Sequence, residues 1–232
     1  MEILGTATLF IVLSLLLAFN PVTIAIFTVL IAGGYGKQQP KSRVGSTALT
    51  YIVSLGLIIS LLGIAWLRLL NTVSIEFVEL ITYVVSLTCI IWGTISLKDY
   101  YWYSQRTSAP KFVTKSIHKR TTKNHKVASA GALAVTTAFA IIPSMLLPYL
   151  GLVTLAGLFG ITSWGAPAII TIALVFPLLC ILTIAMGKIR LSAIMKWRYD
   201  SRMTFRLTIG LTTIFIGWLL LLVLNGTLGV AL

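Results

Sequence analysis

None of the apolar stretches of this sequence has a Lys, Arg, Asp, Glu or His near its centre, and the polar side chains singled out here as candidates lie close to prolines. They fall in two stretches, and the candidate site residues are Asn20, Pro21, Val22, Thr23, Pro143, Ser144, Pro148 and Tyr149. An amide and several hydroxyls can exchange hydrogen bonds with a solute, but they are not ionised at neutral pH. A strongly charged substrate and a side-chain proton relay are therefore disfavoured, and we expect no catalytic residue.

Both proline-containing stretches are longer than one membrane span needs. The first runs over about residues 4–35 and the fourth over about 127–160. A straight helix of about 32 residues rises about 48 Å, against roughly 30 Å of hydrocarbon. Proline removes a backbone donor and displaces the carbonyl four residues earlier. Because free carbonyls are not tolerated against lipid, we expect each helix to be broken at proline and to face protein or water there.

The proline breaks also have a purely structural interpretation. Kinks at proline are common in membrane helices without any functional role. Asn20 can cap the second half-helix and satisfy carbonyls that Pro21 frees, and Ser144 beside Pro143 is open to the same interpretation. A solute could use these same polar groups, so both interpretations stay open at this point.

The composition places the chain in a membrane. Of the 232 residues, 58% are hydrophobic and 10% are charged, and the mean hydropathy is +1.00. A soluble domain cannot bury that much apolar surface. Together with the two long stretches, apolar segments near 44–68, 77–97, 164–187 and 206–230 predict an all-α integral membrane protein of six spans in a single domain, 1–232.

The basic residues indicate the orientation of the spans. Of 18 Lys and Arg residues, all but Arg68 follow the first, third or fifth segment, including the loop 98–126. The positive-inside rule predicts these connections in the cytoplasm and both termini outside, in a multi-pass protein of the plasma membrane. We expect the bilayer as a partner, with anionic lipid headgroups at the basic loops, and no nucleic acid.

A shift of 124 residues brings parts of the two halves into register. Leu87–Gly93, "LTCIIWG", then lies over Leu211–Gly217, "LTTIFIG", and Ala32-Gly33 lies over Ala156-Gly157. Each half has three spans, so the second half enters the membrane in the opposite orientation. The pattern predicts an inverted-topology repeat of about 4–97 and 127–230, whose broken helices meet near the bilayer midplane.

The thiols and imidazoles do not form a recognisable site. Cys89 and Cys180 lie in separate apolar segments without a CxxC pattern, and we expect them to act as small buried hydrophobes. His118 and His125 lack other ligands nearby. We therefore expect no metal and no cofactor.

The sequence resembles the six-span transmembrane domain of cytochrome c biogenesis and disulfide-reductase proteins, the CcdA/DsbD group of the LysE-like superfamily. "FNPVTIAIFTVLIAGG" is similar to the first broken helix of that family, which carries Asn-Pro-Cys, and "IIPSMLLPYLGLVTLAG" to its counterpart with Pro-Cys. "GTISLKDYYWY" and "GLTTIFIGWLLLL" resemble the third and last spans. The resemblance implies two cysteines that carry reducing equivalents between thioredoxin and an outside partner. Here Val22 and Ser144 follow the two prolines, and neither is redox-active.

We therefore expect a non-redox relative that moves a small neutral or lipid-like solute, or that assists assembly of an envelope protein. Its site would lie between residues 20–24 and 143–149. A thiol–disulfide electron carrier that uses Cys89 and Cys180, with a thioredoxin-fold partner, is one alternative. A LysE-type exporter of a small metabolite or ion is another.

Overall fold

A computed structural model describes residues 2–36, 39–101, 127–159, 165–187 and 191–226, and these residues form helices and short turns without a strand. Four helices are long and apolar enough to cross a membrane: α3 (Lys41–Thr72), α4 (Ile75–Tyr101), α8 (Gly165–Met186) and α10 (Arg202–Leu224). The prediction of a helical membrane protein is confirmed at this level. Most of the basic loop 98–126, including His118 and His125, lies outside the described residues.

Two further pairs of helices are bent. The first pair is α1 (Glu2–Ala18) and α2 (Pro21–Gly36), whose axes meet at 58°. The second is α6 (Val127–Ala140) and α7 (Leu147–Leu158), joined through the π-helical turn η1 (Ile142–Leu146) and bent by 79°. If each bent pair is counted as one span, the described residues contain up to six spans.

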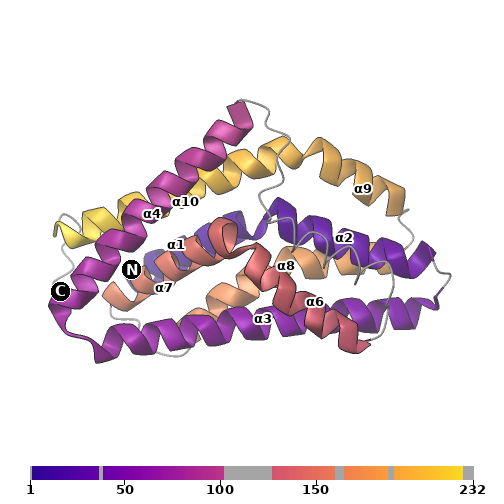
Figure 1. Ribbon diagram of the computed structural model, residues 1–232, viewed down its shortest axis with the longest axis horizontal. Helices are drawn as coiled ribbons and strands as arrows, with labels where there is room; N and C mark the ends of the chain where they lie inside the picture. Colours follow the sequence, from indigo (N-terminus) through magenta and orange to yellow (C-terminus); the bar gives the residue numbers. More distant parts are fainter. Residues whose placement is uncertain (1, 37–38, 102–126, 160–164, 188–190, 227–232) are drawn as a thin grey trace.

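Helix α3 runs along one side of the bundle, at the lower edge of the view in Figure 1, and contacts α6, α7 and α8. One face of α3 is buried at a spacing of four residues, at Tyr51, Leu55, Ile59 and Gly63. The opposite face carries exposed apolar side chains, among them Leu61, which is 63% exposed. An apolar face turned away from the core is what a helix needs in order to contact lipid.

Helices α4 and α10 pack with their backbones almost in contact. A Cβ added to Gly93 would lie 2.8 Å from the carbonyl oxygen of Gly210. A Cβ added to Gly217 would lie 2.8 Å from the carbonyl oxygen of Ser86, whose hydroxyl donates a 2.7 Å hydrogen bond to the Gly217 carbonyl. Small residues at a helix crossing allow this close approach and are typical of packing inside membranes.

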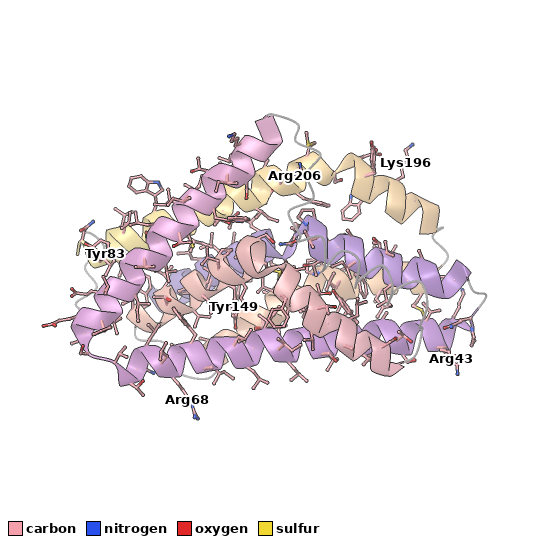
Figure 2. The ribbon with its side chains drawn as sticks, viewed as in Figure 1. Arg43, Arg68, Tyr83, Tyr149, Lys196 and Arg206 are labelled. Atoms are coloured by element: carbon pink, nitrogen blue, oxygen red, sulfur yellow. The ribbon has the colours of Figure 1, made fainter. Side chains whose placement is uncertain are left out.

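The two ends of the bundle differ in charge and in what they join. Helix α1 begins, and α10 ends, at the end where α3 meets α4 (Figure 1). Arg43 and Lys196 lie toward the opposite end, where α2 meets α3, and Arg68 lies on the far part of α3 (Figure 2). The amphiphilic segment α9 (Leu191–Asp200) forms a separate short helix in a connection where the sequence analysis predicted no element.

Candidate functional site

Asn20 begins helix α2. Its side-chain Oδ1 accepts hydrogen bonds from the backbone N–H groups of Val22 at 2.9 Å and Thr23 at 3.3 Å. Its own carbonyl accepts the N–H of Ile24 at 3.0 Å. Pro21 occupies the first helical position, where the missing N–H would have no helical partner anyway. The expected cap on the second half-helix is therefore present, and it explains why α2 starts here.

The same Asn20 side chain joins the two helix breaks. Its Nδ2 donates a 3.0 Å hydrogen bond to Oγ of Ser144, and Asn20 is completely buried. A second, weaker contact crosses beside it, where the Thr23 hydroxyl lies 3.8 Å from Sδ of Met145. Of the candidate residues, Asn20 of the first break and Ser144 of the second are thus in contact. Under the structural interpretation the Asn20 amide could bond to carbonyls that Pro21 frees, and the hydrogen bond that it makes here goes to Ser144 instead.

A local change of hydrogen-bond pattern positions Ser144. The carbonyl of Ile141 accepts three backbone N–H groups, from Ser144 at 3.1 Å, Met145 at 2.8 Å and Leu146 at 3.1 Å. Pro143, inside this turn, has no N–H to offer. The widened turn carries the chain from α6 into α7, and short π-helical turns of this kind are frequent at functional sites.

Pro148 and Tyr149 do not take part in the Asn20–Ser144 contact. Both are buried near the start of α7. The Tyr149 hydroxyl lies 3.3 Å from Oγ1 of Thr171 on α8 and against Gly63 on α3, toward the centre of the bundle (Figure 2). Tyr149 therefore joins α7 to α3 and α8.

Tyr51 was not among the site residues predicted from the sequence. This side chain on α3 is completely buried and stacks on Phe27 of α2, with ring centroids 5.7 Å apart. The Thr137 hydroxyl lies near the Tyr51 hydroxyl but donates to the Leu133 carbonyl at 2.8 Å. Its geometry toward Tyr51 does not make a hydrogen bond, so the Tyr51 hydroxyl has no hydrogen-bond partner among the described residues. Tyrosine inside an apolar span was the available signal, because its hydroxyl needs a partner.

The described part of the site carries no ionised side chain. Among the described residues, no group of three or more His, Cys, Asp or Glu side chains could hold a metal ion. The two described glutamates of α4, Glu76 and Glu79, follow the turn between α3 and α4 at one end of the bundle. What the site offers chemically is therefore an amide, hydroxyls and backbone groups at two helix breaks.

The two cysteines are free thiols in different helices. Cys89 on α4 is buried against α7 and α10. A Cβ added to Gly217 on α10 would lie 3.3 Å from the Cβ of Cys89, and a Cβ added to Gly151 on α7 would lie 3.6 Å from the Sγ of Cys89. Cys180 on α8 is half-buried. Their surroundings fit the expectation of small packing residues.

Comparison of the chain with family models, curated proteins and solved structures gives no match.

Proposed function

We propose that this protein moves a small solute across a membrane through a site formed where its two broken helices meet. The observation that carries the proposal is the hydrogen bond between Asn20 Nδ2 and Ser144 Oγ, which joins the two breaks inside the protein. In secondary transporters, discontinuous helices of this kind supply polar backbone at the bilayer midplane. A site enclosed by helices suits a small solute better than it suits an envelope protein as client.

The proposal includes an inverted repeat of three spans plus three, with both termini outside. Its support is reciprocity. Gly93 packs on the carbonyl of Gly210, and Gly217 packs on the carbonyl of Ser86. A shift of 124 residues converts each member of one contact into a member of the other. Contacts exchanged in this way are expected across a two-fold axis.

The same shift relates Asn20 to Ser144, which are in contact with each other. Equivalent residues meet only on the symmetry axis itself. Under this proposal the axis passes through the paired breaks, and the site lies at the one place that both repeats share. Pro21 directly follows Asn20, whereas Pro143 directly precedes Ser144. In the first repeat the proline would therefore come one residue after the residue on the axis, and in the second repeat one residue before it.

Thiol chemistry is not part of the proposal. Val22 and Ser144 occupy the positions where the resemblance would require cysteine, and the Val22 N–H is used by the Asn20 cap. The thiol–disulfide carrier remains the competing hypothesis. It would have to use Cys89 and Cys180, which are free thiols in separate helices.

The test is a cysteine-accessibility scan in membrane vesicles. Cys89→Ala and Cys180→Ala remove the native thiols, and single cysteines are placed at Val22 and Ser144. We expect both to react with a charged, membrane-impermeant methanethiosulfonate reagent. Matched controls are Ile31→Cys and Leu152→Cys, which lie in the same two broken helices at buried positions outside the proposed site and should not react. Equal inaccessibility of all four positions would contradict a watery site at the breaks.

A further inference from the structure

The first helix break leaves backbone carbonyls without the donors that a continuous helix provides. The carbonyl of Leu17 would bond to the N–H of residue 21, but Pro21 has none. The carbonyl of Ala18 would bond to the N–H of Val22, which instead donates to Asn20 Oδ1 at 2.9 Å. Leu17 and Ala18 are 0% and 2% exposed, so these acceptors lie inside the protein.

The second break repeats the deficit. The carbonyl of Phe139 would bond to residue 143, and Pro143 again has no N–H. The carbonyl of Ala140 would bond to the N–H of Ser144, which instead donates to the Ile141 carbonyl at 3.1 Å. Ala140 is buried. The Asn20–Ser144 hydrogen bond holds the two breaks together, and both ends of it therefore lie next to carbonyls without helical donors.

The donors at the breaks are largely committed. The backbone N–H groups of residues 22 and 23 donate to Asn20 Oδ1, and those of 144–146 donate to the Ile141 carbonyl. One hydrogen of the Asn20 amide goes to Ser144, which leaves the second amide hydrogen and the Ser144 hydroxyl hydrogen as side-chain donors against the three buried carbonyls of Leu17, Ala18 and Ala140. A site with acceptors in excess of donors favours a ligand that only donates or that is positive, because a neutral polar solute also needs donors for its own oxygens.

We propose that the paired breaks bind a monovalent positive group, either an alkali cation or a primary ammonium, through the carbonyl oxygens of Leu17, Ala18 and Ala140. The inference rests on the proposed function, for which it names a singly charged cation as the ligand in place of the neutral or lipid-like solute expected from the sequence. Backbone carbonyls can replace the hydration shell of a monovalent cation, and unwound helices in transporters coordinate ions in this way. A divalent ion would require carboxylates, and the described site has none.

The experiment measures thermal unfolding of the full-length protein in detergent by tryptophan fluorescence. It is run in the chlorides of sodium, potassium, methylammonium and choline at equal ionic strength. A ligand that binds the folded state raises the midpoint in a saturable way. We expect one of the first three cations to raise it above the choline value, and a response to sodium or potassium rather than methylammonium distinguishes an alkali cation from an ammonium group.

Two variants test whether the response comes from the breaks. Pro21→Ala gives the first break an N–H that can donate to Leu17, and should weaken the apparent affinity for the cation about tenfold. Asn20→Asp keeps an oxygen for the cap, adds a negative charge, and should tighten it. Pro177→Ala is the matched control, because Pro177 lies inside α8, which continues through it from Gly165 to Met186, and its replacement should leave the response unchanged. Each variant is compared with its own midpoint in choline.

An equal response to all four chlorides would overturn the proposal, as would a Pro21→Ala variant that responds like the wild type. The accessibility scan separates this result from failure of the proposed function. Reactive cysteines at positions 22 and 144 without a cation response reject the ligand class alone. A cation response with unreactive cysteines rejects the watery path and retains the binding site.

Discussion

Asn20 and Ser144 are separated by 124 residues in sequence, and a 3.0 Å hydrogen bond joins their side chains. The same separation relates "LTCIIWG" to "LTTIFIG". One amide therefore has two roles, because its oxygen caps α2 while its nitrogen reaches the second broken helix. A local helix signal and a long-range contact depend on the same side chain.

Removal of this side chain should affect both roles. Asn20→Ala is expected to lower the free energy of unfolding by about 2 kcal/mol, since a helix cap and a buried hydrogen bond are lost together. Chemical unfolding followed by tryptophan fluorescence measures the change. Asn71→Ala is the control, because Asn71 is exposed near the end of α3. Equal stability of the two variants would show that the Asn20 contacts contribute nothing.

The contact between α4 and α10 should not accept a larger side chain. Gly217→Ala places a methyl group 2.8 Å from the Ser86 carbonyl oxygen, and should destabilise the protein by about 1–3 kcal/mol by forcing the helices apart. Gly131→Ala is the matched control on α6, where the nearest atom to an added Cβ, Ser54 Oγ, is 3.6 Å away. Alanine is favoured over glycine in helices, so this control should be neutral or slightly stabilising. A Gly217→Ala variant as stable as Gly131→Ala would contradict the close packing.

The two buried tyrosines should respond differently to loss of the hydroxyl. Tyr51→Phe removes a hydroxyl that has no partner among the described residues, and should leave the thermal midpoint unchanged or raise it. Tyr149→Phe removes a hydroxyl that lies 3.3 Å from Thr171 Oγ1, and should cost about 1 kcal/mol. A larger loss for Tyr51→Phe than for Tyr149→Phe would mean that a bound molecule or a moved Thr137 satisfies Tyr51 in the native protein.

The two native thiols should be dispensable. The double variant Cys89→Ala, Cys180→Ser keeps an apolar group in the packed position of α4 and a polar one in the half-buried position of α8. We expect neither it nor the wild type to form a mixed disulfide with a thioredoxin that lacks its resolving cysteine, as judged by non-reducing electrophoresis. A thioredoxin adduct that requires Cys89 or Cys180 would favour the electron-carrier hypothesis.

The sequence predicted the elements well and the contacts between them less well. The Asn20-Pro21 pair is a local signal for the start of a helix, so the break and its cap could be predicted at residue level. The proximity of residues 20–24 to 143–149 was expected from the repeat. The actual partner of the Asn20 amide could not be predicted, because it depends on the widened turn around Ile141.

Other features gave no usable pattern. Tyr51 lies at a helical spacing with apolar neighbours on α3. The sequence therefore predicts an ordinary buried apolar face there, and only the fold shows that the Tyr51 hydroxyl is enclosed. Helix α9 has too many charged residues to stand out as an apolar segment, and the sequence analysis treated it as a connection. Pro148 and Tyr149 were grouped with the second break because they are near in sequence, but the direction of α7 carries Tyr149 to Gly63 and Thr171.

The meeting of the two breaks is tested most directly by cross-linking. Asn20→Cys and Ser144→Cys are combined in the background without native thiols, and a protease site is placed between the halves, within residues 102–126. After treatment with a short bifunctional methanethiosulfonate and cleavage, we predict that the halves stay joined on a non-reducing gel and separate on reduction. The control pair Asn71→Cys and Ser144→Cys should separate in both conditions. Halves that separate without reduction for the Asn20–Ser144 pair would contradict the account.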